Sequence, residues 1–288
     1  MNDSNVTWRS ALSERLEIEH FEPLSSAVAL ELGAASVCGA LRSHNSDHYL
    51  AIRLGRTEET LVSSLPEADL PPRFAEYGYA MAVADGRGDC GAGARASRLA
   101  LSTLAHLLIR YGKWSLRVDP STIDEIVERS EFLYRRTHDV LREARRSNPL
   151  LARMAASVTA MYIAGGDLFY VHVGHSTGFL FRDGHLVRLT ADDAIDPAAS
   201  MDAAGRSDRI GGPTDPRIDI EHVEVFPGDR LLLCTNGLTD AVSEHDIANV
   251  LALCRRPADE CQQLIDLAGA ARAADDLTVL VADYRLRR

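Results

Sequence analysis

Apolar residues follow two different periods along this chain, and these periods divide it into strand-like and helix-like segments. Spacing of three and four residues, typical of amphipathic helices, occurs at residues 97–111 and in a segment that starts with a capping-box pattern at Ser121. Ser243 and Pro257 mark two further helix starts. Alternating or continuous apolar runs predict strands at residues 26–41, 77–84, 155–190, 230–234 and 277–284.

Turn-forming residues separate these segments and indicate how they connect. Residues 55–74 contain three prolines and predict a loop, while residues 192–219, rich in Ala, Asp, Gly and Pro, predict an irregular flap. Turn signals at residues 165–167 and 182–184 punctuate the apolar stretch between 155 and 190, as in an antiparallel meander. Helices grouped between runs of hairpin strands predict an α+β fold of antiparallel sheets with helices on their faces.

Composition narrows the class of protein. The 288 residues contain neither a repeat nor a linker, so we expect an N-terminal extension over residues 1–30 and one domain over residues 31–288. The formal net charge is −11, from 31 Lys and Arg against 42 Asp and Glu, which disfavours nucleic acid and anionic membranes as partners. Five scattered cysteines, the lack of a signal-peptide pattern and the lack of a long apolar run predict a cytoplasmic protein.

Four oxygen-bearing side chains stand at predicted strand ends or in turns, namely Asp47, Asp85, Asn236 and Asp275. Carboxylates gathered in one pocket repel one another unless a divalent cation neutralises them, and hard oxygen ligands suit Mg²⁺ or Mn²⁺. Two such ions about 3.5–4 Å apart can hold a phosphoryl group and activate a water molecule. Taken singly, each of these residues is more simply explained as a turn former.

Several segments, taken in order, resemble the metal-dependent (type 2C) protein serine/threonine phosphatases, especially the bacterial ones. RSHNSDHYL, which starts at Arg42, resembles the motif Arg-x-x-Asn-Glu-Asp, and VADGRGD, which contains Asp85, resembles Val-Ala-Asp-Gly-Met-Gly-Gly. GDRLLLCTNGLTD and DDLTVLVA resemble the family's Gly-Asp-x-Leu-Leu-Leu-Cys-Thr-Asp-Gly-Leu-Thr-Asp and Asp-Asn-x-Thr-Val. The resemblance runs from about residue 35 to 284. It implies a four-layer αββα sandwich, in which two antiparallel sheets are flanked by helices.

The resemblance also implies roles for individual residues. Asp85 would bridge two metal ions, either Mn²⁺ or Mg²⁺, and the Gly86 carbonyl would bind one of them. Asp275 would be a further ligand, and Asp47 would hold metal-bound water. Arg42 would grip the substrate phosphate, for which the planar guanidinium group is suited. The implied partner is a phosphoserine or phosphothreonine protein, such as a bacterial-type protein kinase or its substrate.

Three positions depart from the family pattern, and each loses an acidic group. Asn236 stands where the family has a metal-binding aspartate, so its carbonyl oxygen could still be a ligand but carries no charge. Ser46 replaces a glutamate that holds water on the second metal, and His175 replaces an aspartate implicated in a third metal site. We therefore expect weakened catalysis. The alternative is an inactive pseudophosphatase that binds a phosphoprotein or acts as a regulatory module.

Two other motifs are weaker. Gly86-x-Gly88-x-x-Gly91 fits the dinucleotide fingerprint, but no βαβ unit with a ribose-binding acid follows, and Asp85 would repel the pyrophosphate. His44 and His48 have a four-residue spacing outside any predicted helix, which disfavours a zinc site.

Overall fold

The computed structural model describes residues 24–66, 70, 73–89, 91–113, 115–190 and 209–287. The strands are β1 (Val28–Val37), β2 (Asp47–Glu58), β3 (Phe74–Arg87), β4 (Ala155–Ala164), β5 (Asp167–Val173), β6 (Thr177–Arg182), β7 (His185–Arg188), β8 (Asp219–Glu224), β9 (Arg230–Cys234) and β10 (Leu277–Leu286). The helices are α2 (Leu24–Ala27), α3 (Ala92–Tyr111), α4 (Pro120–Ser147), the short 3-10 helix η2 (Pro149–Leu151), α6 (Asn236–Thr239), α7 (Glu244–Leu251) and α8 (Pro257–Ala270).

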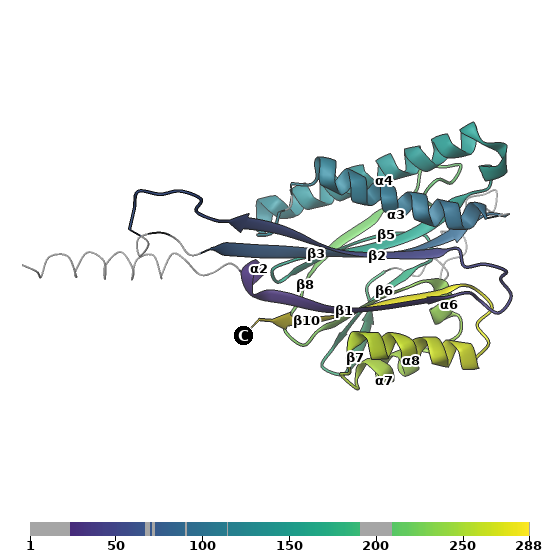
Figure 1. Ribbon diagram of the computed structural model, residues 1–288. Coiled ribbons are helices and arrows are strands. Elements are labelled where there is room, and N and C mark those ends of the chain that lie inside the picture. The colour runs from purple at the N-terminus through teal and green to yellow at the C-terminus, as the bar shows by residue number, and fades with distance from the viewer. Residues whose placement is uncertain are drawn as a thin grey trace, which may run out of the picture.

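Two antiparallel five-stranded sheets stack face to face between two layers of helices (Figure 1). One sheet, here called the β3 sheet, has the order β2-β3-β4-β5-β8 and is covered by α3 and α4. The other, here called the β10 sheet, has the order β1-β10-β9-β6-β7 and is covered by α7 and α8. This arrangement confirms the predicted αββα sandwich.

Strict alternation along the central strands produces the layers. Met81 and Val83 on β3 pack in the core between the sheets, whereas Ala82 packs against the helices on the outer face. On β9, Leu231 and Leu233 pack between the sheets, and the intervening leucine packs toward α7 and α8. Successive strand side chains point to opposite faces, so a strand buried on both faces is apolar throughout, as RLLLC is.

Most predicted elements are present, but their limits differ. The loop predicted from residue 55 begins later, because β2 continues to Glu58, which pairs with Phe74. β1 begins at Val28, just before the predicted domain boundary, because Val28 pairs with Leu286. The N-cap of α4 is Asp119, which accepts the N–H of Thr122, so the prediction that the helix starts with a cap at Ser121 was wrong.

The predicted meander between residues 155 and 190 is also wrong. β4 and β5 form a hairpin in the β3 sheet, whereas β6 and β7 form a hairpin in the β10 sheet. The chain therefore changes sheets after β5. The other neighbour of β5, besides β4, is β8, a strand that the sequence pattern did not predict. Most of the predicted flap, residues 191–208, lies outside the described residues.

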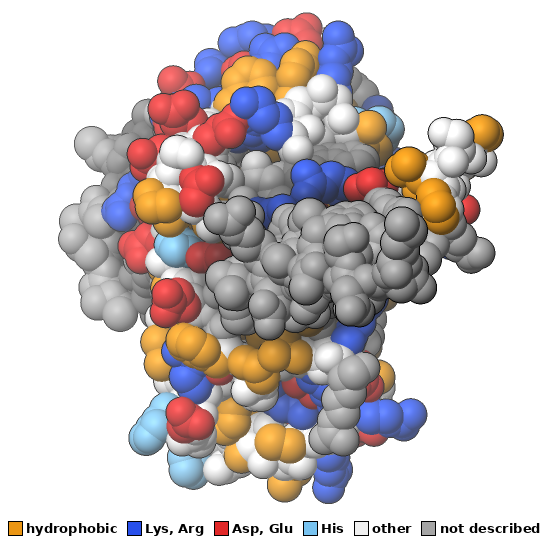
Figure 2. Space-filling model, turned by 90° about the vertical axis from the view of Figure 1, so that its left-hand side faces the viewer, with side chains coloured by type: hydrophobic (Ala, Val, Ile, Leu, Met, Phe, Trp, Pro, Cys, Tyr) orange, Lys and Arg blue, Asp and Glu red, His pale blue; other side chains and the backbone are white. Residues whose placement is uncertain are grey.

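At the end of the sandwich where β1 and β3 begin, the surface carries charges of both signs. Figure 2 looks at this end of the sandwich, and on its described part acidic, basic and apolar side chains are interspersed. None of the helices in the described ranges combines the length and apolar character of a membrane-spanning segment.

Candidate metal and phosphate site

Two carboxylates, one buried and one partly buried, lie on paired strands at one end of the sandwich. Asp47 begins β2 and is the register partner of Asp85 near the end of β3. Asp85 shares the strand parity of Met81 and Val83, so its side chain lies on the face between the two sheets. Asp47 is 6% exposed and the Asp85 side chain 15%. The structure thus places Asp47 and Asp85 side by side on neighbouring strands at this end of the sandwich.

The two carboxylates disfavour each other's charge. Burial, together with the neighbouring charge of Asp85, raises the pKa of Asp47 to about 8. Burial likewise raises the pKa of Asp85, although the positive charge of Arg209 opposes that change. A site with this electrostatic character favours bound cations, because a cation stabilises both ionised carboxylates.

The second sheet contributes hydrogen bonds that hold this end together. Thr235, which follows β9, donates to Asp47 Oδ2 at 2.7 Å. Asp276, which precedes β10, accepts the backbone N–H groups of Gly39 at 3.0 Å and Ser46 at 2.8 Å. Asp276 therefore fixes the loop between β1 and β2, and this loop carries Arg42.

Arg42 and Asp275 form an ion pair at the outer edge of the site. Arg42 Nε donates to Asp275 Oδ1 at 2.7 Å, and Nη2 lies 2.6 Å from the same oxygen. The Arg42 side chain is 50% exposed and that of Asp275 is 28% exposed. The hydrogen bond with Asp275 raises the pKa of Arg42, which keeps the guanidinium group charged. The structure thus places Arg42 beside Asp275, at the outer edge of the acidic cluster.

Gly86 lies where no side chain fits. A Cβ at this position would come 2.0 Å from the carbonyl oxygen of Gly93 in the first turn of α3. The backbone of β3 therefore packs directly on the start of α3, beside Asp85. Gly237 is similar, since a Cβ there would lie 2.1 Å from the carbonyl oxygen of Asp276. These contacts explain why glycine occupies both positions, each of which directly follows a candidate ligand.

The three departing residues lie around the same end. Asn236 begins α6, and its Nδ2 donates to Asp240 Oδ2 at 3.1 Å. The Ser46 carbonyl accepts a hydrogen bond from Ser97 on α3 at 2.6 Å. The backbone N–H of His175 donates to Ser157 Oγ at 3.1 Å, and Ser157 is the register partner of Asp85 on β4.

Sequence reasoning missed Thr235, Asp276 and also Arg209. Arg209 lies just after the undescribed segment, is 5% exposed, and places Nη1 3.9 Å from Asp85 Oδ2. Burial lowers the pKa of this guanidinium to about 10. Its position inside a segment without periodicity left no local signal, because a single arginine in an irregular segment is most simply a surface residue.

The donor chemistry of the site fits a divalent cation, but the candidate ligand side chains already contact other protein groups. Asp47, Asp85, Asp275, the Asn236 carbonyl and the Gly86 carbonyl offer the hard oxygen atoms that Mg²⁺ and Mn²⁺ prefer. Among the residues that the structure describes, however, no group of three or more His, Cys, Asp or Glu side chains converges closely enough to hold a metal ion. Arginines lie beside Asp85 and Asp275 instead.

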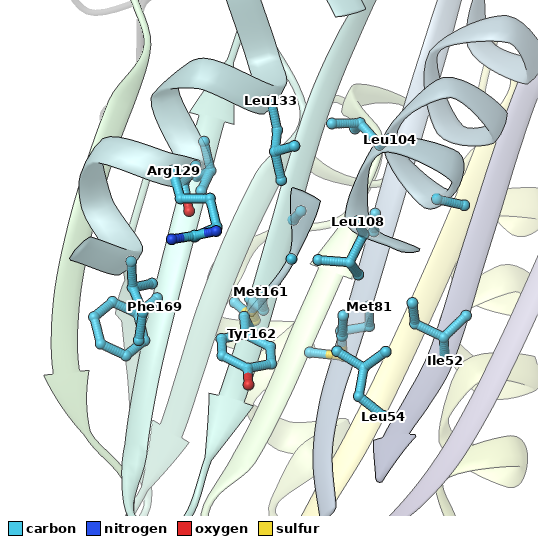
Figure 3. Close-up of a pocket in the computed structure, with 18 of the residues that line it drawn as sticks. Ile52, Leu54, Met81, Leu104, Leu108, Arg129, Leu133, Met161, Tyr162 and Phe169 are labelled. Carbon is cyan, nitrogen blue, oxygen red and sulfur yellow. The ribbon is translucent and has the colours of Figure 1, made fainter. Parts of the chain in front are cut away.

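A separate cavity lies on the outer face of the β3 sheet, beneath α3 and α4. Its volume is about 140 Å³, and Figure 3 shows Leu104, Leu108 and Leu133 pointing from the helices toward residues of the strands. Its described lining contains no Asp, Glu, His or Cys. This cavity therefore offers neither metal ligands nor an acid–base pair, and the end of the sandwich remains the candidate site.

Known proteins share both the sequence pattern and the fold. The serine/threonine protein phosphatase PstP of Mycobacterium tuberculosis is 31% identical over 217 residues, which cover 70% of this chain and 40% of that protein. The chain thus spans well under half the length of this relative. The serine/threonine phosphatase stp of Listeria monocytogenes is 26% identical over 222 residues, covering 71% of this chain and 84% of that protein.

Solved structures agree with these relatives. The catalytic domain of PstP in complex with two manganese ions superposes with a TM-score of 0.67 at 27% identity, covering 90% of this chain and 99% of that one. The family model described as Stage II sporulation protein E (SpoIIE) matches residues 75–285, which include β3 through β10 and with them most of both sheets. This chain therefore belongs to the SpoIIE family and carries a type 2C phosphatase-like domain.

Proposed function

We propose that the protein is a metal-dependent phosphoserine/phosphothreonine phosphatase whose metal site is weakened. The observation that carries this proposal is the largely buried pair of Asp47 and Asp85, at the same end of the sandwich as the accessible guanidinium of Arg42, which contacts Asp275. A buried acidic pair beside an exposed arginine suits a site that binds cations on one side and a phosphate group on the other.

The family resemblance supplies the roles of the residues in this proposal. Asp47, Asp85, Asp275, Asn236 and the Gly86 carbonyl would hold Mn²⁺ or Mg²⁺, with two ions as the expected number. When bound, these ions supply Lewis acidity and positive charge for the phosphoryl oxygens.

Arg42 would orient the substrate. Half of its side chain is exposed, so its guanidinium can exchange the Asp275 carboxylate for a phosphate oxygen. Asp276 would keep the Arg42 loop in place, because it holds the backbone of the same loop through two hydrogen bonds.

The relatives support the substrate class. PstP and stp are named serine/threonine phosphatases, and PstP was solved with two manganese ions. We propose a phosphoserine or phosphothreonine protein as the substrate, with a bacterial-type protein kinase or its target as the client. We also propose that it acts in the cytoplasm, supported by the free thiols of the four described cysteines, Cys38, Cys234, Cys254 and Cys261.

A second candidate is a pseudophosphatase that binds phosphoproteins without hydrolysing them. It is favoured by the neutral side chains at Asn236 and Ser46, together with His175, where the family pattern has acids. The amide of Asn236 also donates to Asp240, so its carbonyl is its one metal-binding atom.

Hydrolysis of a phosphothreonine peptide with Mn²⁺ tests the proposal. The unaltered protein, Asn236→Asp and Asn148→Asp should be compared, because Asn148→Asp adds the same charge at the N-cap of η2, outside the site. We expect slow, chelator-sensitive hydrolysis by the unaltered protein and by Asn148→Asp, and faster hydrolysis by Asn236→Asp. Absence of hydrolysis in all three proteins, with retained phosphopeptide binding, would favour the pseudophosphatase.

A further inference from the structure

Arg209 is placed at the acidic pair by a specific backbone contact. Its neighbour Ile210 forms an isolated antiparallel bridge with Ala156 at the start of β4, with both backbone hydrogen bonds at 2.9 Å. Ile210 is fully buried and packs with Leu141 and Met154 in the core beneath α4. This bridge continues the β3 sheet beyond the end of β5.

The bridge determines the direction of the Arg209 side chain. Ile210 points to the outer, helix-covered face of the sheet, so the preceding residue points to the inner face. Asp85 lies on that inner face, and its register partner on β4 is Ser157, the residue after Ala156. The position of Arg209 near Asp85 thus follows from strand geometry and from the burial of Ile210.

The buried guanidinium of Arg209 adds a positive charge next to the carboxylate of Asp85. Buried ions are tolerated when they are paired, and Arg209 is 5% exposed with Nη1 3.9 Å from Asp85. Asp275 has Arg42 in the equivalent role. Two guanidinium groups thus lie beside candidate acidic ligands, Arg209 at Asp85 and Arg42 at Asp275, and they offset part of the negative charge that a metal ion would neutralise.

We propose that Arg209 is a tethered counter-ion for Asp85, which lets this domain fold without metal and weakens its affinity for divalent cations. A cation bound at Asp85 would lie next to the guanidinium and be repelled by it, so binding must displace Arg209 or overcome its charge. The inference rests on the proposed function in one respect, namely that Asp85 is a metal ligand. It adds a residue that sets the strength of that site.

Mn²⁺ binding to the full chain tests the competition. Free Mn²⁺ should be followed by electron paramagnetic resonance for the unaltered protein, Arg209→Gln, Arg209→Lys, Asn236→Asp and Arg135→Gln. We expect Arg209→Gln to bind Mn²⁺ at least about tenfold more tightly, because it removes a positive charge beside the ion. Arg209→Lys, which keeps the charge, should stay near the unaltered protein. Arg135→Gln removes a charge from an exposed position on α4 and should leave binding unchanged.

Thermal unfolding gives a readout that does not depend on catalysis. In EDTA, the unaltered protein should unfold cooperatively, and Arg209→Gln should unfold at a lower temperature. Saturating Mn²⁺ should raise the midpoint of Arg209→Gln more than that of the unaltered protein. If Arg209→Gln does not fold, the double variant Asp85→Asn/Arg209→Gln tests whether the unpaired charge of Asp85 is the cause. Recovery of folding in EDTA supports a counter-ion pair, and continued failure overturns it.

The outcomes separate this inference from the proposed function. Tight Mn²⁺ binding by Asn236→Asp without any gain in Arg209→Gln would overturn the role of Arg209 and leave the phosphatase proposal standing. Tighter binding by Arg209→Gln without phosphopeptide hydrolysis by any variant would support the role of Arg209 and count against the phosphatase. No Mn²⁺ binding by any variant would overturn both.

Discussion

The hydroxyl of Thr235 joins the two sheets at the acidic end of the sandwich through Asp47. It donates to Asp47 Oδ2 at 2.7 Å and accepts the backbone N–H of Thr278 at 2.9 Å. Thr235 follows β9 in one sheet and Asp47 begins β2 in the other, so this side chain links the two sheets at this end. The same hydrogen bond supports the ionised form of a carboxylate that burial otherwise disfavours.

Loss of this hydroxyl should destabilise the domain. We expect Thr235→Val to lower the free energy of unfolding by about 1–3 kcal/mol, because it leaves a buried carboxylate oxygen and a buried N–H without their partner. Thr235→Ser keeps the hydroxyl and is the matched control. Urea unfolding at constant pH measures both, and equal losses in the two variants would mean that packing of the threonine methyl matters instead.

A buried ion network at the far end of β9 should be more sensitive. Arg230 is 4% exposed, and its Nη1 lies 2.5 Å from Glu260 Oε2, while Nη2 lies 3.4 Å from Asp283 Oδ2. Arg230→Met should cost about 3–5 kcal/mol, since it leaves the buried Glu260 without its cation and Asp283 with Arg285 alone. Arg135→Met on the surface of α4 should change the stability by less than about 0.5 kcal/mol. Similar unfolding midpoints for the two variants would contradict the network's importance.

The close approach of β3 to α3 predicts a steric effect at Gly86. Gly86→Ala would place a Cβ 2.0 Å from the Gly93 carbonyl oxygen, so β3 or α3 must shift, and we expect a loss of more than about 2 kcal/mol. Gly269→Ala is the control, because that position lies in α8 with open space around it and should gain up to about 1 kcal/mol. Thermal denaturation in EDTA compares them, and an unaffected Gly86→Ala would show that this contact relaxes easily.

His172 should make stability depend on pH. It is 1% exposed on β5, with Nδ1 2.8 Å from Thr159 Oγ1, and burial lowers its pKa to about 4. The unfolded chain takes up a proton near pH 6.5 but the folded protein does not, so the free energy of unfolding falls as pH falls from 6.5 to 4, by on the order of 3 kcal/mol.

The comparison of the unaltered protein with His172→Gln isolates this effect. The variant should lose less stability between pH 6.5 and 4, and the remaining loss comes from groups such as His48 and His138, whose pKa values burial also lowers. Asp47 works in the opposite direction in both proteins, because its raised pKa removes stability as pH rises toward 8. Parallel pH profiles of urea unfolding for the two proteins would rule out His172 as the cause.

The sequence by itself determined the layered fold and most of its elements. The apolar runs of β3 and β9 are local patterns that indicate burial on both faces, so they are readable without tertiary contacts. The motifs around Arg42 and Asp85 were readable for a similar reason, since each lies in a short segment with a recognisable order of residues.

Tertiary structure alone decided which residues share the acidic end. Thr235 and Asp276 act through contacts to chain segments about 190 and 230 residues away, and Arg209 reaches Asp85 because Ile210 bridges to Ala156. The change of sheet after β5 depends on β8 becoming the neighbour of β5, which is again a distant pairing. Local periodicity records which face of an element is buried, but the partner on that face is chosen by the packing of the whole chain.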